Sequence, residues 1–267
     1  MVDFSNKPRY NYDDLVKIME ILRSEGGCPW DREQTHESIR NNFIEETYEA
    51  VEAIDKGDIE LLKEELGDVL LQVVFHARIA EEAGRFNVDD VADGICQKLI
   101  VRHPHIFGDT VAENSAEVLV NWDNIKQQTK GITSQTESMI KVATSLPALM
   151  RAQKVQQKAA KVGFDWTSIE GALDKIDEEA AELRLAAGTE RAAEELGDLI
   201  FAAVNAARFV GADAEEALFR ATEKFIGRFQ YVEETARASG RKLEDMSLEE
   251  MDRLWEEKKR IDARRPG

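Results

Sequence analysis

The sequence is poor in proline and cysteine, and it is short of positive charge. Only five of its 267 residues are proline, so long stretches are free to form helices, whose interiors proline breaks. Lysine and arginine number 35 against 53 aspartates and glutamates, which gives a formal net charge of −18. A protein that binds the nucleic-acid backbone regardless of sequence needs a basic face. The composition therefore predicts no nucleic-acid partner.

Long apolar runs and paired cysteines are also missing. The most apolar stretch, Val69–Ala80, contains Gln, His and Arg and is too short to span a bilayer, so it predicts a core helix and no membrane partner. Cys28 and Cys96 form neither a CxxC pair nor a metal-ligand spacing, which is typical of reduced thiols. The amino end lacks a basic region followed by an apolar run. These features predict a cytoplasmic protein.

An internal repeat organises the chain. The pentapeptide EELGD occurs at Glu64–Asp68 and again at Glu194–Asp198, inside longer segments that resemble each other. Further along, Lys98, Arg102, Trp122 and Lys126 of the first half correspond to Lys224, Arg228, Trp255 and Lys259 of the second. The matches keep their order, which indicates a tandem duplication. We expect an amino-terminal domain over 1–130, a linker over 131–147 and a carboxyl-terminal domain over 148–267.

Each half predicts about four helices. The apolar residues that recur at helical spacing include Leu15, Ile18, Met19 and Leu22. Turns are expected at Lys56–Asp58 and Ala187–Thr189, where Asp58 and Thr189 are suited to cap the following helix. No bounded run alternates apolar and polar residues as a strand does. The predicted fold class is all-α, with tandem duplicated helical bundles and a helix hairpin that carries carboxylates in each half.

Acidic pairs lie on both sides of each expected turn. They are Glu46 with Glu49 and Glu65 with Asp68 in the first half, and Glu179 with Glu182 and Glu195 with Asp198 in the second. Residues three apart share a helix face, and the two legs of each hairpin have similar lengths. Four carboxylates should therefore converge between antiparallel helices. Leu66, Val69 and Leu70 surround Asp68, so we expect this face to turn inward.

Gathered carboxylates need protons or cations to neutralise them. Oxygen ligands suit Mg²⁺, with Mn²⁺ as a possible substitute. A di-iron centre is the rival use, but it needs Glu-x-x-His, and His76 lies eight residues past Asp68. Bound Mg²⁺ beside Lys and Arg favours phosphoryl chemistry. Lys224 and Arg228, one helical turn apart, can hold a triphosphate, and Trp255 can stack on a base.

The acidic motifs resemble those of the MazG nucleoside triphosphate pyrophosphohydrolases of the two-domain type, which belong to the all-α NTP pyrophosphatases. The resemblance covers nearly the whole chain and includes GCPWD (Gly27–Asp31), RHPHIFGD (Arg102–Asp109) and SLPALMRAQK (Ser145–Lys154). It implies Mg²⁺-dependent hydrolysis of NTPs and dNTPs to nucleoside monophosphate and pyrophosphate, with broad base specificity. It also implies a homodimer built by pairing bundles.

The same resemblance assigns roles to residues. Glu179, Glu182, Glu195 and Asp198 would hold Mg²⁺ and carry catalysis, while Lys175, Glu178, Lys224, Arg228 and Trp255 would meet the nucleotide. The family's activity is attributed to the carboxyl-terminal domain. In this sequence Lys175 aligns with Asn42, so the first half lacks a cation beside its cluster, and Asn205, which aligns with Phe75, can contact the sugar.

Two questions stay open at this point. A second possible metal site in the first half is intact, with Glu46, Glu49, Glu65 and Asp68. We expect that half to be mainly structural or regulatory. The alternative for the whole chain is a non-catalytic helical dimerisation or regulatory scaffold with a vestigial metal site.

Overall fold

The computed structural model describes residues 4, 6–108, 114, 117–118, 122, 125 and 131–264. These residues form helices and no strand, which confirms the all-α fold class. The chain divides into two compact units, Met1–Lys126 (unit 1) and Gln127–Gly267 (unit 2). The domain limits drawn from the sequence stay a prediction, and Asp109 and Lys126 lie outside the described residues.

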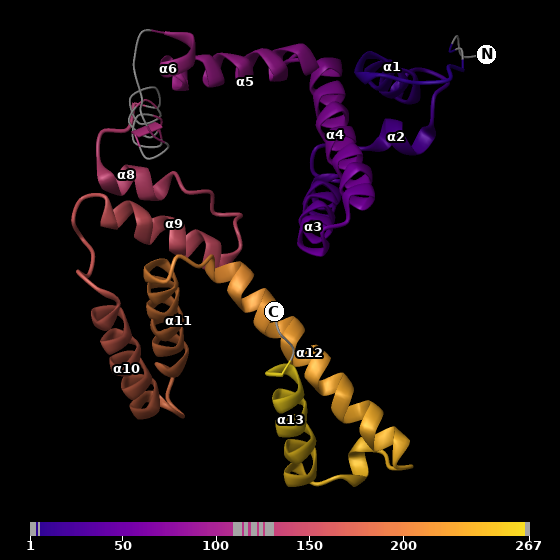
Figure 1. Cartoon of the computed structure of the whole chain (residues 1–267). Coiled ribbons are helices and arrows are strands. Elements are labelled where there is room, and N and C mark those ends of the chain that lie inside the picture. Colours follow the sequence, from indigo (N-terminus) through magenta and orange to yellow (C-terminus); the bar gives the residue numbers. More distant parts are fainter. Residues whose placement is uncertain are drawn as a thin grey trace. The chain divides into compact units, whose positions relative to one another are not determined.

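Unit 1 is built around a helix hairpin. Its helices are α1 (Tyr12–Arg23), α2 (Pro29–Glu33), α3 (Arg40–Lys56), α4 (Ile59–Glu82), α5 (Val88–Arg102) and α6 (Pro104–Phe107). Helices α3 and α4 pair along their length, and α1 packs against α4 (Figure 1). The apolar stripe of α1 contributes Met19 to a core that contains Ile39, Val74 and Phe75. The helical spacing in the sequence therefore marks this core correctly.

Unit 2 repeats the hairpin. Its helices are α8 (Gln135–Ile140), α9 (Ala148–Ala160), α10 (Ile169–Ala186), α11 (Ala192–Phe209), α12 (Ala214–Ala238) and α13 (Leu248–Asp262), with a 3₁₀ turn η1 (Leu243–Asp245) before α13. Helices α10 and α11 correspond to α3 and α4, and α9 packs on α11 as α1 packs on α4. Helix α12 runs away from the hairpin, and α13 packs on its far part (Figure 1).

The two hairpin turns differ in how they begin the second helix. Gly57 ends α3 in the left-handed region (φ 65°), and the Asp58 side chain then accepts a hydrogen bond from the Leu61 amide at 3.0 Å. This confirms Asp58 as the N-cap of α4. The same prediction for Thr189 is wrong, because the longer loop continues to Arg191 before α11 begins. The Thr189 hydroxyl instead donates to the Ala186 carbonyl at 2.7 Å, at the end of α10.

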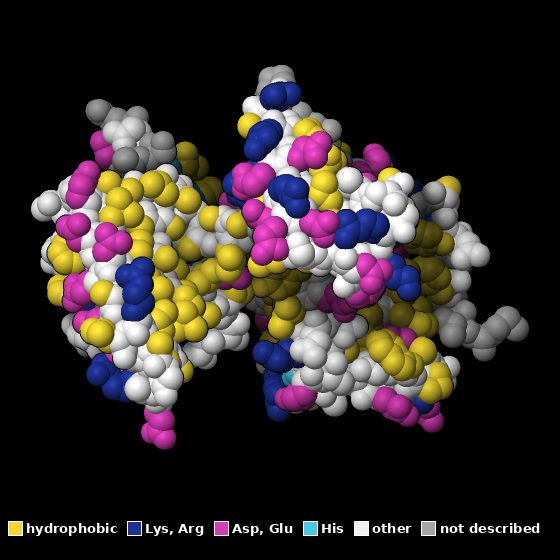
Figure 2. Space-filling model, turned by 90° about the horizontal axis from the view of Figure 1, so that it is seen from below, with side chains coloured by type: hydrophobic (Ala, Val, Ile, Leu, Met, Phe, Trp, Pro, Cys, Tyr) yellow, Lys and Arg dark blue, Asp and Glu magenta, His cyan; other side chains and the backbone are white. Residues whose placement is uncertain are grey.

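Large apolar side chains remain exposed along both hairpins. Leu66 and Leu70 are 54% and 39% exposed, so the expectation that this face is buried is wrong for a single chain. On α11 the equivalent residues Leu196 and Ile200 are exposed to a similar extent. Figure 2 shows hydrophobic side chains as broad yellow areas of the surface. Exposed apolar areas of this kind mark interaction surfaces. None of the described helices is both apolar enough and long enough for a membrane span.

The hairpin turn of unit 1 gives a stability test. We expect Gly57→Ala to lower the free energy of unfolding by about 1 kcal/mol, since alanine is strained in the left-handed region. Gly94→Ala is the matched control, because Gly94 lies within α5 with open space where a Cβ would be. That change should stabilise by up to about 1 kcal/mol through helix propensity. Urea unfolding followed by circular dichroism measures both, and equal shifts of the same sign would contradict the assigned turn.

Candidate metal and nucleotide site

Three carboxylates of unit 2 meet between α10 and α11. One oxygen from each of Glu179, Glu182 and Glu195 lies within 4.8 Å of the other two. Two helical positions three apart supply Glu179 and Glu182, and the antiparallel helix supplies Glu195 from across the hairpin. Glu179 and Glu195 are 6% and 3% exposed, whereas Glu182 is exposed. The convergence predicted from the spacing is therefore observed for three of the four acids.

Asp198, the fourth predicted acid, stands at the edge of this group. It lies one helical turn beyond Glu195 on α11 and is exposed. The three-carboxylate cluster does not include it. Its side chain is thus free to turn toward a ligand that approaches from solvent.

Cations hold the two buried acids of unit 2. The Lys175 ammonium lies 2.6 Å from a Glu179 oxygen and 2.9 Å from a Glu178 oxygen. Arg191 pairs in the same way with Glu195, four residues along the chain. These ion pairs raise the pKa of Lys175 well above its ordinary value, with Glu179 the larger cause. Glu182 forms no ion pair with any residue that the structure describes, and the charge of Glu195, together with partial desolvation and the charge of Glu179, raises the pKa of Glu182.

Unit 1 carries a matching cluster without the cations. Oxygens of Glu46, Glu49 and Glu65 lie within 4.8 Å of one another. Burial and the charges of Asp68 and Glu49 raise the pKa of Glu46, and burial and the same two neighbours raise the pKa of Glu65. Among the described residues, no lysine or arginine forms an ion pair with these acids. The repulsion between the carboxylates therefore stays uncompensated by ion pairs in the described part of unit 1, whereas Lys175 and Arg191 partly offset it in unit 2.

The donor sets fit a small hard cation. Both clusters offer only carboxylate oxygens, the ligands that Mg²⁺ prefers over nitrogen or sulfur. Two oxygens on opposite sides of one Mg²⁺ lie about 4 Å apart, given metal–oxygen distances of about 2.1 Å. The three carboxylate oxygens of each cluster lie within 4.8 Å of one another, so small side-chain rotations can bring them onto one ion. His76 contributes nothing to the cluster, since its ring pairs with His36 at 2.8 Å.

The predicted triphosphate and base contacts lie elsewhere in the chain. Lys224 and Arg228 are on α12 and Trp255 is on α13, in the pair of helices that stands away from the α10–α11 hairpin (Figure 1). There the Arg228 guanidinium lies over the Trp255 ring, 5.7 Å from its centre, and pairs with Asp262 at 3.1 Å. A single chain therefore joins Lys175 and Glu178 to the acidic cluster but does not bring these three residues to it.

Asn205 and Arg191 are two further residues of α11 and its N-cap, and the expected contact of Asn205 with the sugar stays a prediction. Asn205 lies on α11 beyond the acidic cluster, where its side chain accepts a hydrogen bond from Arg208 at 2.9 Å. Arg191 was not singled out from the sequence, although it stands four residues before Glu195, a spacing at which helical side chains meet. The pairing was not predicted because the turn was expected to end at Thr189, whereas α11 begins only after Arg191.

Comparisons with known proteins agree over nearly the whole chain. The MazG nucleotide pyrophosphohydrolase domain family matches residues 34–107, a range that contains the cluster of unit 1. The nucleoside triphosphate pyrophosphohydrolase/pyrophosphatase MazG of Thermotoga maritima is 46% identical over 248 residues, 93% of this chain and 95% of that protein. The nucleoside triphosphate pyrophosphohydrolase of Escherichia coli K12 is 46% identical over 254 residues, 93% of this chain and 97% of its own. The uncharacterized protein YabN of Bacillus subtilis is 46% identical over 266 residues, 96% of this chain and 53% of that protein.

The repulsion within the cluster predicts a stability effect. Glu182 binds its proton more tightly when folded, so the metal-free protein loses stability as pH rises from the ordinary glutamate pKa through the raised one. Glu182→Gln should therefore raise the melting temperature without metal, and by more at pH 7 than at pH 4. Millimolar Mg²⁺ should stabilise the wild type more than this variant, because the ion binds only the folded cluster. Differential scanning fluorimetry with and without EDTA measures both effects.

Glu194→Gln is the control for that experiment. Glu194 is the exposed neighbour of Glu195 and lies outside the cluster, so it changes the net charge equally. Its response to Mg²⁺ should equal that of the wild type. A Glu182→Gln protein with an unaltered melting temperature and an unaltered Mg²⁺ response would show that the carboxylates neither repel one another nor share an ion.

Proposed function

We propose that this chain, which belongs to the MazG family of nucleotide pyrophosphohydrolases, hydrolyses nucleoside triphosphates to nucleoside monophosphate and pyrophosphate. The observation that carries the proposal is the group formed by Glu179, Glu182 and Glu195 beside Lys175. Similarity to two nucleoside triphosphate pyrophosphohydrolases extends over 93% of the chain and so includes both hairpins. Its two free cysteines, Cys28 and Cys96, suit a cytoplasmic enzyme.

The proposed cofactor is Mg²⁺, with Mn²⁺ as a substitute. Glu179, Glu182 and Glu195 would hold it, and Asp198 can join from the edge of the cluster. When bound, such an ion neutralises phosphate charge and lowers the pKa of a coordinated water. Lys175 can leave Glu179 and bind the incoming phosphates, because the phosphates then pair with Lys175 and the metal ion pairs with Glu179. Glu178 also forms an ion pair with Lys175 and so holds its ammonium group beside the cluster before substrate binds.

A homodimer completes the site in this proposal. Lys224, Arg228 and Trp255 lie on α12 and α13, the pair of helices that stands away from the α10–α11 hairpin (Figure 1), so a second copy would present them to the triphosphate and the nucleoside. The exposed apolar side chains of α11, Leu196 and Ile200, supply a surface for such pairing. The buried core of unit 2 consists mostly of small residues, which leaves its large apolar side chains to a partner.

We expect broad base specificity because the groups proposed to bind the substrate recognise its phosphates rather than its base. Lys175, Lys224 and Arg228 recognise phosphate by charge, and charge is the same for every nucleoside triphosphate. Canonical and deoxy substrates should therefore both be accepted. The rates for individual bases depend on weaker contacts to the nucleoside.

The reaction is tested by its products and by two isosteric variants. With Mg²⁺, purified protein should release pyrophosphate and nucleoside monophosphate from a panel of NTPs and dNTPs. Glu182→Gln or Asp198→Asn should lower turnover by at least about a hundredfold, because each removes charge from the metal cluster while keeping the side-chain shape. Glu194→Gln should keep the wild-type rate. Release of orthophosphate and nucleoside diphosphate would contradict the reaction, and near-normal rates in both variants would move the active site elsewhere.

We further propose that unit 2 performs most of the chemistry. Lys175 and Arg191 offset charge at its cluster, whereas Asn42 stands at the position of Lys175 in unit 1. A charged hydrogen bond to phosphate contributes about 1–3 kcal/mol, roughly one to two powers of ten in affinity. Unit 1 would then bind Mg²⁺ but hold nucleotide weakly.

Paired double variants compare the two units. Glu49→Gln with Asp68→Asn should leave most activity, while Glu182→Gln with Asp198→Asn should abolish it. Lys175→Asn should raise the Michaelis constant by about tenfold or more, because the neutral amide cannot offset phosphate charge. Steady-state pyrophosphate release measures all three. If each double variant loses about half of the activity, both units are working sites and the lysine–asparagine difference is incidental.

A further inference from the structure

Two histidines of unit 1 meet although they come from different parts of the chain. His36 lies in the segment between α2 and α3, and His76 lies on α4. Their Nδ1 atoms are 2.8 Å apart, and their ring planes differ by only 7°. At this distance one Nδ1 carries a proton and the other accepts it in a hydrogen bond. The two imidazoles therefore direct one nitrogen each toward a single point.

This pair can exchange its hydrogen bond for a metal ion. An imidazole binds a metal through an unprotonated nitrogen, so the neutral form is required. Burial, and then the charge of His36, lower the pKa of the His76 imidazole, which keeps that ring neutral at neutral pH. If the shared proton moves from Nδ1 to Nε2 of its own ring, both Nδ1 lone pairs become available. The exchange then needs no net release of a proton.

Gln72 offers a third donor atom next to the pair. It lies one helical turn before His76 on α4, a spacing at which side chains are neighbours. Gln72 is 6% exposed, and its Oε1 is buried and accepts no hydrogen bond from any residue that the structure describes. A buried amide oxygen without a partner is costly. A cation held by the two imidazoles would satisfy it.

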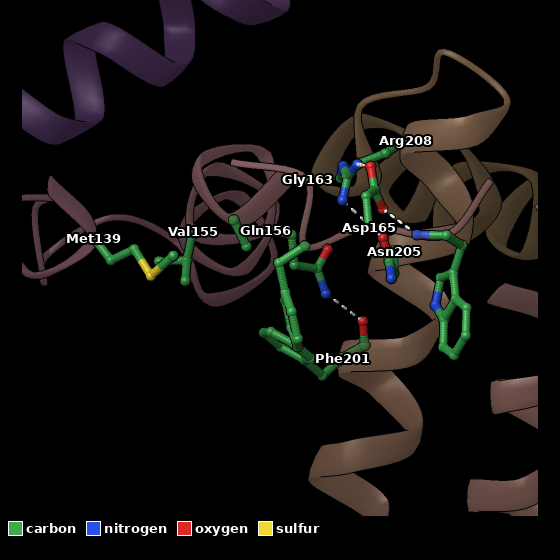
Figure 3. A pocket seen from close by; sticks show the side chains of 11 residues that line it. Met139, Val155, Gln156, Gly163, Asp165, Phe201, Asn205 and Arg208 are labelled. Carbon is green, nitrogen blue, oxygen red and sulfur yellow. Dashed lines mark hydrogen bonds and ion pairs between the residues drawn. The ribbon is translucent and has the colours of Figure 1, made fainter. Parts of the chain in front are cut away.

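The repeat shows that these polar side chains are particular to unit 1. With the two EELGD segments aligned, Gln72 and His76 correspond to Ala202 and Ala206 on α11. On that stretch of α11, Asn205 lines a hollow of about 450 Å³ between α11 and α9 (Figure 3). Unit 1 therefore places donor atoms where the duplicated helix carries methyl groups, so the hairpin itself does not require them.

The histidine pair is separate from the acidic cluster of unit 1 and differs from it in chemistry. His76 lies eight residues past Asp68, about 12 Å along the axis of α4. Imidazole nitrogens suit Zn²⁺ and its neighbours among the transition metals, whereas carboxylates alone suit Mg²⁺. Two nitrogens bound to one tetrahedral Zn²⁺ at about 2.0–2.1 Å lie about 3.3 Å apart, so the observed pair needs only a small widening. The Phe43 ring covers His76, with 5.7 Å between ring centres.

We infer that His36, His76 and Gln72 form a binding site for a transition-metal ion, with Zn²⁺ as the ion that fits best. Water completes the four positions around Zn²⁺. Because His36 precedes α3 and His76 is on α4, the bound ion joins these two parts of unit 1 and stabilises their contact. The site is independent of the proposed function, and it gives unit 1 a ligand that unit 2 does not share.

Nuclear magnetic resonance of the histidine rings tests the site directly, because the chain contains only four histidines. The full chain is labelled with ¹⁵N-histidine, saturated with Mg²⁺ and titrated with Zn²⁺. The Nδ1 resonances of His36 and His76 should shift on binding. His103 and His105 are the internal control, since their ring centres are 5.6 Å apart and the His103 Nδ1 already contacts the Leu99 carbonyl oxygen. Their resonances should stay in place.

Variants that copy unit 2 supply the second measurement. In isothermal titration calorimetry with Mg²⁺ at saturation, His76→Ala should bind one Zn²⁺ fewer than the wild type. Gln72→Ala should bind Zn²⁺ at least about tenfold more weakly, and His103→Ala should match the wild type. Zn²⁺ should raise the melting temperature of the wild type more than that of His76→Ala.

Three results would overturn the inference. Zn²⁺ that leaves the His36 and His76 resonances unmoved would show that the pair binds no metal. Equal shifts of all four histidines would indicate weak chelation at the surface. The same number of Zn²⁺ ions in His76→Ala and the wild type would place the ions in the carboxylate clusters. Pyrophosphate release from nucleoside triphosphates tests the proposed function separately, so either conclusion can fail alone.

Discussion

Repulsion between carboxylates held close together is the constraint on which both hairpins depend. Three acids in each unit approach within 4.8 Å because two antiparallel helices joined by a short turn bring them to facing positions. The folded chain therefore carries electrostatic strain at this point, visible in the raised pKa of Glu46 and Glu65 in unit 1 and of Glu182 in unit 2. A divalent cation relieves that strain, so its affinity is built into the fold before any substrate arrives.

The two units differ in how they meet this constraint, and under the proposed function this difference separates the binding of metal from the binding of substrate. In unit 2, Lys175 and Arg191 neutralise the two buried acids, so cations that can turn to phosphate are already in place. Unit 1 has no ion pair at its cluster among the described residues, and its core is closed by Phe75. After a duplication, one copy can thus keep the metal geometry while losing the groups that recognise a nucleotide.

The sequence predicts the helices and the convergence of acids well, because both follow from local spacing along a helix. Met19 and Asp58 illustrate this, since apolar periodicity and capping chemistry are properties of a few neighbouring residues. Exposure of Leu66 could not be predicted, because apolar residues on a helix do not reveal whether their partner lies in the same chain. The pairing of Arg191 with Glu195 could not be predicted either, because it depends on the length of the loop between α10 and α11. The hollow that Gln156 lines between α9 and α11 could not be predicted, because it depends on how these two helices cross.

Alanine occupies most of the buried positions on the paired helices, including Ala50 and Ala53 on α3 and Ala172 and Ala202 on α10 and α11. The separation of packed helices depends on the side chains at their contact, so small residues permit a close approach. The distance between the helices then determines which ionic radius the carboxylates can accommodate. Metal–oxygen distances of about 2.1 Å for Mg²⁺ and about 2.3–2.6 Å for Ca²⁺ require different spans between the same carboxylates. Residues that never touch the ion would therefore discriminate between the two alkaline-earth cations.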